Sequence, residues 1–542
     1  MPRPWFTKAI IYEVDPRTFF DSDGDGKGDL AGLTRKLDYI AGLGVNTIWL
    51  NPFFESPERD DGYDVADFYT VDPSLGSLGD FVVLLEEARA LGLRVVVELV
   101  VNHTSDQHPW FRRALEGGDA PTRDYYIWVD EPPVDSPERI TFTPEEGDDP
   151  SPWTFHEPSG QYYLHRFYPH EPDLDHANQH VQSEMYKVMS TWLALGVDGF
   201  RIDAAPYIAE KAAAADDFHD AHHYLRSMRS HIADRRPEAI LMAEADVDAS
   251  KLGDYMGDSG EMNLVLSFLA SQTVFLALGR ESAAPLERML EVIPEGTAGS
   301  TYANFLRNHD ELDLERLSPD DREFVFETFA PDQDMRIFGR GIRRRPAPML
   351  DGDRDRLRMA HSLIFSLPGV PVLRYGDEIG MGDDLSLPDR SSVRTPMQWT
   401  SGHNAGFSEA PSDDLYYPVV TEGGFGYEQV NVEDQEADPE SQLSWTVRMI
   451  HARRQSRPMR SQHWQLVDTG NPAVFGLRYQ DEDDVALTFH NLSSQPQAVM
   501  GDATEHLERV HPVFGDLEAK VEAGREFELA RYGHLWLAAR TS

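Results

Sequence analysis

Apolar segments of strand length recur along the chain as far as Glu378, and amphipathic stretches separate several of them. Leu30–Leu43 and Phe81–Leu91, for example, repeat apolar residues at the spacing of a helix. Strands that alternate with helices indicate a parallel α/β sheet, and eight of them match a (β/α)8 TIM barrel. The predicted strands are Ala9–Pro16, Asn46–Pro52, Arg94–His103, Gly196–Asp203, Ala239–Ala245, Glu261–Phe268, Ala303–Asp310 and Val370–Glu378.

The alternation breaks in two places. Between residues 103 and 175 the chain is rich in proline, aspartate and aromatic residues, and a connection of that length should carry structure of its own. We therefore predict a structured insertion after the third strand, which we call the B subdomain. From about His463 short alternating segments predict a C-terminal all-β sandwich domain. The predicted divisions are 1–102 (first part of the barrel), 103–175 (B subdomain), 176–460 (remainder of the barrel) and 461–542 (C-terminal domain).

Composition narrows the class of protein. The 542 residues include no cysteine, which excludes disulfides and thiol chemistry and suits a reducing compartment. No apolar run has the length of a signal peptide or a membrane span, so we expect a soluble, cytoplasmic protein without a membrane partner. A net charge of −45 disfavours nucleic acid as a partner. This charge fits either an adaptation to high salt or an ordinary acidic enzyme, and the sequence leaves a homo-oligomer open.

Several predicted strands end in polar residues. Arg201 and Asp203 end one strand, Glu244 and Asp310 lie at the ends of two others, and His103 ends a fourth. A single Arg-x-Asp is more often a surface ion pair. In a parallel barrel, however, all strands end at the same rim, where catalytic residues usually lie. Three acids and a histidine placed in this way predict one assembled site.

The stretches that contain these residues carry a family resemblance. NPFFESP, ELVVNH, GFRID, AEA and RNHD, in this order, resemble the α-amylase superfamily of retaining glycoside hydrolases and transglycosylases. Within it the chain is similar to the trehalose synthases, which isomerise maltose to trehalose. This likeness rests on DSDGDGKGD, RDDGYDVADFY, VNHTSDQHPWF, FLRNHDELDL, GRGIRRRPAPML and VRTPMQW.

The resemblance implies roles for the three acids. Retaining cleavage of a glycosidic bond needs two carboxyl groups about 5–5.5 Å apart. Asp203 is the predicted nucleophile, because Arg201 projects from the same strand face and favours an ionised carboxylate. Glu244, flanked by alanines, is the predicted proton donor, since desolvation would raise its pKa. Asp310 would stabilise the oxocarbenium-like charge. Glu98 stands where the family usually has aspartate, which should shift its contact with Arg201.

Further residues are implied to bind the sugar. Asp61 and Tyr63 match positions that hold the non-reducing glucose in the family. His103 and His309 are expected to donate hydrogen bonds to sugar hydroxyls. The oligo-glucosidase branch ordinarily has glutamine at Glu171 and asparagine at Asp175, so acceptor preference is open there. The full predicted substrate-binding set is Asp61, Tyr63, His103, Phe167, Glu171, Arg201, His309 and Arg394.

Two metal sites are predicted. Carboxylates that alternate with glycines in Asp21–Asp29 suit Ca²⁺, although a solvated acidic turn has the same composition. The resemblance favours the metal, held by Asp21, Asp23, Asp25, Asp29 and the backbone carbonyl of Lys27. It also implies a second Ca²⁺ site, formed by Asn102, Asp173, Tyr207 and Glu210.

Whether the enzyme isomerises or hydrolyses depends on water. Released glucose can attack the glucosyl-enzyme only if the closed site excludes water. We expect arginines at the rim, Arg343–Arg345 and Arg394, to hold that glucose, with trehalose as the main product and glucose as a minor one. The alternative is an α-glucosidase or transglucosidase acting on short α-glucosides. A non-catalytic binding subunit of the same fold should have lost one of the three acids, and all three are present.

Overall fold

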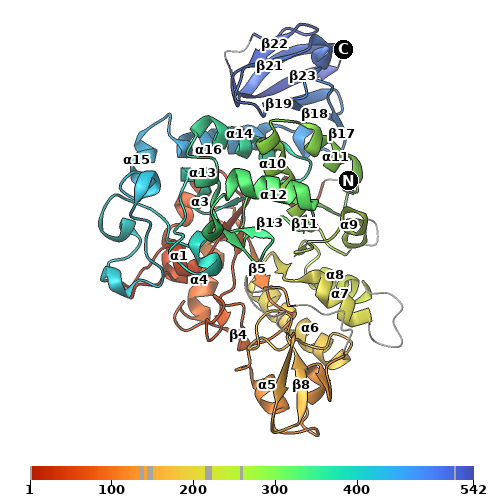
Figure 1. The fold of residues 1–542 in the computed structure, drawn as a ribbon, viewed down its shortest axis with the longest axis vertical. Helices are drawn as coiled ribbons and strands as arrows, with labels where there is room; N and C mark the ends of the chain where they lie inside the picture. Colours follow the sequence, from red (N-terminus) through yellow and green to blue (C-terminus); the bar gives the residue numbers. More distant parts are fainter. Residues whose placement is uncertain are drawn as a thin grey trace.

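The computed structural model describes residues 3–133, 140–142, 151–213, 222–256, 261–517 and 520–541. At its centre is a closed barrel of eight parallel strands (Figure 1). Each strand overlaps a segment predicted from the sequence, so the predicted (β/α)8 barrel is confirmed. Around the barrel the strands are β1 (Ile11–Val14), β2 (Thr47–Leu50), β5 (Arg94–Leu99), β9 (Gly199–Ile202), β10 (Ile240–Ala243), β11 (Leu264–Leu266), β12 (Thr301–Phe305) and β16 (Val370–Arg374).

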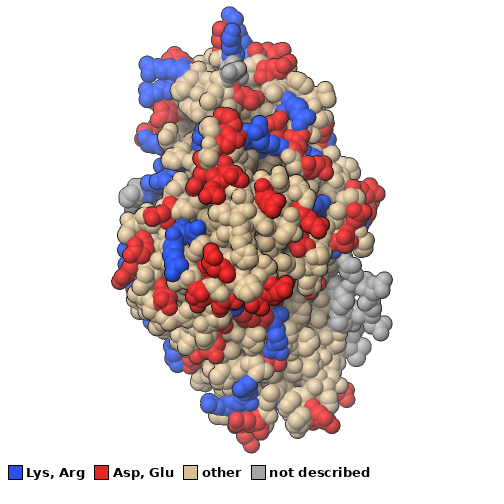
Figure 2. Space-filling model, turned by 90° about the vertical axis from the view of Figure 1, so that its left-hand side faces the viewer, with Lys and Arg blue, Asp and Glu red and all other residues tan. Residues whose placement is uncertain are grey.

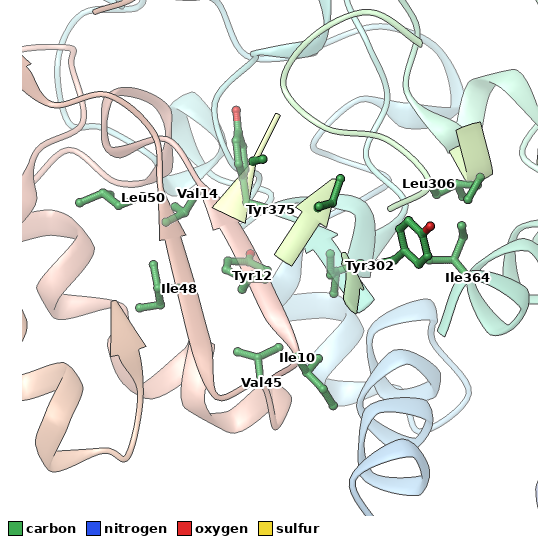
Figure 3. Packing of buried hydrophobic residues seen from close by; sticks show 14 of the residues in the cluster. Ile10, Tyr12, Val14, Val45, Ile48, Leu50, Tyr302, Leu306, Ile364 and Tyr375 are labelled. Atoms are coloured by element: carbon green, nitrogen blue, oxygen red, sulfur yellow. The ribbon is translucent and has the colours of Figure 1, made fainter. Parts of the chain in front are cut away.

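Barrel strands are apolar on both faces because both are buried. Tyr12 and Val14 of β1 belong to the large outer cluster under the helices, and Figure 3 shows them beside Ile48 and Leu50 of β2. Ile11, which precedes Tyr12, belongs instead to a second cluster, where it packs with apolar side chains from the other strands. This continuous apolar character is what made the strands recognisable in the sequence.

Helices surround the barrel, and polar residues set their ends. Asn178 caps α6 through its side chain, and Gly196 ends the helix at φ 119°, in the left-handed region that favours glycine. The chain then turns directly into β9. The main surrounding helices are α2 (Leu30–Arg35), α3 (Leu37–Leu43), α4 (Leu78–Ala90), α6 (Gln179–Leu195), α7 (Ala205–Ala213), α8 (His223–Arg235), α10 (Phe268–Arg280), α11 (Ala284–Val292), α14 (Arg354–Ser366) and α16 (Gln442–Gln455).

Two insertions stand at the carboxyl ends of the strands. The B subdomain contains a three-stranded sheet and forms the lower end of the molecule in Figure 1. A smaller three-stranded sheet follows β12. The elements of these insertions and their surroundings are α1 (Pro16–Phe19), β3 (Phe54–Glu55), β4 (Asp67–Val71), α5 (Pro109–Ala114), β6 (Trp128–Val129), β7 (Trp153–His156), β8 (Gln161–Leu164), α9 (Ala249–Tyr255), β13 (Leu312–Asp313), α12 (Pro319–Phe329), β14 (Arg336–Ile337), β15 (Gly341–Ile342), α13 (Pro346–Met349) and α15 (Val432–Ala437).

The C-terminal region is antiparallel and lies at the opposite end from the B subdomain (Figure 1). A five-stranded sheet and a two-stranded sheet share one apolar cluster, to which Val499 and Phe527 of the smaller sheet contribute. This agrees with the predicted all-β domain. Its strands are β17 (Trp464–Leu466), β18 (Val474–Asp481), β19 (Asp484–Asn491), β20 (Gln497–Val499), β21 (Leu507–Gly515), β22 (Phe527–Leu529) and β23 (His534–Thr541).

The charge of the chain is spread over its surface. On the face drawn in Figure 2, acidic and basic groups are intermingled, with acidic groups in excess. Within the described residues, no helix has the length and apolar character needed to cross a membrane.

Candidate active site

Arg201 joins the predicted catalytic acids. It is opposite Glu98 in the register of β5 and β9. One of its terminal nitrogens, Nη1, contacts both Glu98 and Asp203, and the other, Nη2, lies 3.0 Å from Glu244 Oε1. Asp203 and Glu244 therefore contact the same guanidinium, which places the two carboxyl groups side by side. A retaining enzyme needs two carboxyl groups that lie close together.

The local backbone explains why these side chains meet. Asp203 follows the last residue of β9, and Glu244 follows the last residue of β10. Gly199 opens β9 without a side chain because a Cβ there would lie 2.4 Å from the carbonyl oxygen of Ile240 in β10. The amide N–H of Ala204 donates to Glu244 Oε2 at 2.8 Å and holds that carboxyl beside Asp203.

The pKa of Asp203 is shifted in the direction opposite to the one that Arg201 alone would give. Burial and the neighbouring Glu244 carboxyl raise the pKa of Asp203, and they outweigh the opposing charge of Arg201. The charge of Arg201 favours the ionised carboxylate, as predicted, but in the sugar-free site it does not set the direction of the shift. Asp203 is buried and Glu244 is half-buried beside it, so the loss of solvent and the repulsion between the two carboxyls act together on Asp203.

Glu98 lies beneath the pair, as predicted. Its carboxylate accepts a 2.5 Å hydrogen bond from the Trp49 indole and contacts Arg201. Burial raises the pKa of Glu98 to about 7, although Arg201 opposes the shift. The longer side chain thus keeps the support that aspartate gives in the family.

The third acid, Asp310, is surrounded by cations. Arg390 Nη1 lies 2.8 Å from it, Arg394 Nη2 3.0 Å, and His309 Nε2 3.0 Å. Burial alone would raise the pKa of Asp310, but these three cations hold it well below its usual range. In turn Asp310 and Glu13 raise the pKa of His309 to about 9, against the effect of burial. His309 is therefore charged at neutral pH and can only donate hydrogen bonds, as expected.

Asp61 closes the end of the site beside Asp310. It accepts hydrogen bonds from Arg394 at 2.5 Å, Tyr416 at 2.7 Å and Tyr417 at 2.8 Å. Burial would raise the pKa of Asp61, yet Arg394 and the two hydroxyls lower it to about 2. The Tyr63 hydroxyl is 2.5 Å from His309 Nε2. Asp61, Tyr63 and Arg394 are buried, so this end of the site is closed and charged.

The rim arginines are not placed as predicted. Arg394 is buried between Asp61 and Asp310, at the closed end and not at the acceptor side. Arg343 donates to backbone carbonyls of neighbouring loops, Arg344 pairs with Asp383, and Arg345 pairs with Asp377. The Arg343–Arg345 segment therefore joins loops to one another and does not face the sugar.

His103, Phe167 and Glu171 come together under the B subdomain. The rings of His103 and Phe167 are 5.1 Å apart, and His103 Nε2 lies 3.9 Å from Glu171 Oε1. Burial lowers the pKa of His103 to about 4, so the ring is neutral. Burial and the carboxylates of Asp60 and Asp64 raise the pKa of Glu171 well above its usual range. Burial and these like charges therefore favour the neutral form of the Glu171 carboxyl.

A cavity of about 250 Å³ opens from Glu244 and Asp310 toward the rim. This volume is small compared with the about 300–1,000 Å³ of ordinary ligand pockets. Arg340, next to β15, donates to the Thr141 carbonyl of the B subdomain at 2.7 Å and so connects the two insertions above the cavity. The wall includes Phe142, Phe167, Tyr207, Asp246, Phe268, Glu311, Asp313, Arg316, Arg340 and Arg390.

The chain matches a known enzyme family over most of its length. The α-amylase family, which is defined by the alpha amylase catalytic domain, matches residues 12–324 and 343–462. The chain belongs to the α-amylase family. The trehalose synthase of Pimelobacter sp. (strain R48) is 41% identical over 522 residues, which cover 93% of this chain and 90% of that protein. The trehalose synthase/amylase of Mycolicibacterium smegmatis is 42% identical over 91% of this chain and 85% of that protein.

A solved relative has the same fold. The trehalose-6-phosphate hydrolase of Bacillus licheniformis is 25% identical and superposes with a TM-score of 0.78, covering 99% of this chain and 100% of that one. The resemblance predicted from short sequence stretches therefore extends over nearly the whole chain.

The first predicted metal loop forms a compact group of carboxylates. One oxygen each from Asp21, Asp23 and Asp29 lie within 4.8 Å of one another. Burial and the neighbouring carboxylates raise the pKa of Asp23. Burial acts on Asp21 too, but hydrogen bonds from Ser408 and from the Gly26 and Gly24 amides lower the pKa of Asp21. These oxygens suit Ca²⁺. Asp25 is not in the group, and its carboxylate accepts the Lys27 N–H at 2.9 Å.

The second predicted metal site is replaced by an ammonium group. Lys211 Nζ lies 2.6 Å from Asp173 Oδ2, 2.7 Å from Asn102 Oδ1 and 3.2 Å from the Asn102 carbonyl. Glu210 pairs instead with Arg166, and the Tyr207 hydroxyl contacts Thr141. The prediction of Ca²⁺ at Asn102, Asp173, Tyr207 and Glu210 is wrong because a lysine occupies the position that the cation would take.

Sequence reasoning missed several functional residues of this family site. Arg390 precedes the predicted Arg394 by four residues in the same stretch, so it could have been chosen with it. Glu13 lies in the first predicted strand, but its neighbour His309 is 296 residues away. Tyr416 and Tyr417 lie in a loop without regular periodicity, and no local signal singled them out.

Proposed function

We propose that this member of the α-amylase family isomerises maltose to trehalose and releases glucose as a minor product. The trehalose synthases that match over nine-tenths of the chain support this assignment. The structural observation that carries it is the small cavity lined by Glu244 and Asp310, which two connected insertions cover.

In this proposal the closed end binds the glucose that is transferred. Asp61 accepts hydrogen bonds from the outer hydroxyls of this glucose, and Arg394 donates to them. His309, as a cation, donates to another hydroxyl. Tyr63 offers its ring and hydroxyl on the same side. The fixed ion pairs of these groups need little rearrangement when the sugar binds, which favours a single orientation.

Asp203 and Glu244 then carry out the double displacement. Asp203, ionised when the sugar is bound, attacks the anomeric carbon while Glu244 donates its proton to the departing oxygen. The glycosidic bond breaks, and the glucosyl group forms an ester with Asp203. Asp310, held ionised by its cations, stabilises the positive charge that develops on the ring.

The acceptor determines the product. The released glucose occupies the cavity, turns, and attacks the ester through its anomeric hydroxyl, with Glu244 as the base. Water would give glucose instead, so the cover formed by the B subdomain and the β13–β15 sheet favours trehalose. Arg316 and Arg340 line this cavity and are suitable donors to the acceptor sugar.

The test is incubation of the purified chain with maltose alone, followed by separation and quantification of the sugars. We expect trehalose as the main product, glucose as a minor one, and neither product above background for Asp203→Asn. Near-complete conversion of maltose into glucose would overturn the isomerase assignment in favour of an α-glucosidase. Normal turnover by Asp203→Asn would overturn the assignment of the nucleophile.

We also propose a structural Ca²⁺ at Asp21, Asp23 and Asp29, remote from the sugar. The gathered carboxylate oxygens support it. The ion would tie the loop after β1 and take no part in the reaction. A cytoplasmic location stays a prediction.

A further inference from the structure

A second cavity lies at the opposite end of the barrel from the catalytic acids. Its volume is about 230 Å³, and it lies where the chain enters β1 and β2. We call it the cationic cavity because its wall contains four cationic residues and no carboxylate. Its lining residues are Thr7, Lys8, Ala9, Ile10, Asn46, Arg453, Arg454 and Arg460.

Two of these cations have no protein partner. Among the described residues, neither Lys8 nor Arg460 forms an ion pair or a side-chain hydrogen bond. Arg453 is 4% exposed and donates to the carbonyls of Met459 and Gly369, yet its Nε has no acceptor. In a chain with a net charge of −45, four cations without a lining carboxylate are an unusual local excess of positive charge.

The electrostatics of the cavity reflect this excess. Burial, together with the charges of Arg454 and Arg3, lowers the pKa of Arg460. Burial lowers the pKa of Arg453 to about 10, and the charge of Arg460 contributes. The like charges repel one another in a partly desolvated space, and a bound anion would relieve this repulsion.

A purely structural explanation covers only part of the cluster. Arg453 and Arg454 lie in the last turn of α16, where cations interact favourably with the helix dipole, and Arg454 donates to the Gly44 carbonyl at 2.9 Å. Lys8 and Arg460 lie outside that helix. Their convergence on the same cavity is what the dipole does not explain.

The adjoining space suggests what the anion is attached to. A cavity of about 440 Å³ shares Thr7 and Arg460 with the cationic cavity, so the two meet at these residues. It is lined by β17 and the end of α11, beside the N-terminus in Figure 1. Trp464, Gln462 and Glu295 lie in its wall, and they offer an aromatic face and polar groups suited to hydroxyls.

We propose that the two cavities together bind a phosphorylated sugar, with the phosphate among Lys8, Arg453, Arg454 and Arg460 and the sugar beside Trp464. Guanidinium groups match the oxygens of phosphate in geometry as well as charge, and several of them converge here. This site is distinct from the catalytic one, which stands at the carboxyl ends of the strands. It does not depend on the reaction proposed above.

The test uses the full chain and two measurements, thermal unfolding and isothermal titration, at constant ionic strength. The probes are inorganic phosphate, glucose 6-phosphate and glucose. We expect glucose 6-phosphate to raise the unfolding temperature saturably and to bind more tightly than inorganic phosphate. Arg460→Gln should weaken binding of glucose 6-phosphate by about tenfold or more, with maltose turnover unchanged. Trp464→Ala should weaken the binding of glucose 6-phosphate but leave the binding of inorganic phosphate unchanged.

Arg457→Gln is the matched control, because this nearby guanidinium pairs with Asp481 and Glu482 and does not line either cavity. Arg457→Gln should bind inorganic phosphate and glucose 6-phosphate as tightly as the unchanged chain does. Three results would overturn the proposal: no saturable effect of glucose 6-phosphate, equal binding by Arg460→Gln and the unchanged chain, or affinity for glucose 6-phosphate no greater than for inorganic phosphate.

Discussion

Lys211 should stabilise the junction of the barrel and the B subdomain as a built-in cation. Its ammonium is buried and in contact with Asp173 and with both oxygens of Asn102. Lys211→Ala would leave the buried Asp173 carboxylate without its main counter-charge. Breaking a buried pair by removal of one partner costs about 3–5 kcal/mol, and we expect a loss of this size here.

A second substitution separates charge from packing. Asp173→Asn removes the uncompensated carboxylate, so adding it to Lys211→Ala should recover part of the lost stability. The assay is unfolding of the whole chain by heat and by urea, followed by circular dichroism. Lys187→Ala, which removes an exposed lysine paired with Glu184, is the control and should unfold as the unchanged chain does.

Calcium provides an independent measurement on the same position. In Lys211→Ala the oxygens of Asn102 and Asp173 remain as hard ligands around a vacated volume, so added Ca²⁺ should stabilise this variant more than the unchanged chain. The reasoning is refuted if Lys211→Ala loses less than about 1 kcal/mol, the range of ordinary surface pairs.

Three further outcomes are expected. Arg340→Gln should raise the ratio of glucose to trehalose formed from maltose, because it removes the bond to the Thr141 carbonyl above the cavity; Arg336→Gln on the same hairpin should not, and equal ratios would contradict the role. For Glu171, the pKa in the folded chain lies well above the unfolded value, so the stability of the unchanged chain relative to Glu171→Gln should fall as the pH rises above about 4.5; parallel unfolding temperatures between pH 5 and 9 would refute this. Removal of Ca²⁺ by a chelator should lower the unfolding temperature while turnover of maltose at room temperature changes little. The shift in unfolding temperature should disappear in Asp21→Asn but persist in Asp25→Asn, whose carboxylate is outside the gathered group.

The sequence by itself determined the barrel and the place of Asp203 and Glu244 at its rim. Strands buried on both faces are continuous apolar runs, so their number and order could be read directly. Asp203 and Glu244 could be found because each directly follows such a run, and because the carboxyl ends of parallel strands meet on one rim. Both signals are local in sequence.

Only the tertiary structure decided which charges meet. Lys211 reaches Asn102 across 109 positions, and Arg394 reaches Asp61 across 333. The pattern of apolar residues does not indicate partners so far apart in the sequence. A metal was therefore predicted where Lys211 lies, and contacts with the acceptor sugar were predicted for Arg343–Arg345, which instead join loops. The protonation of Asp203 has the same origin. Arg201 is its neighbour in sequence, but burial and Glu244, which act through space, determine the direction of its pKa shift.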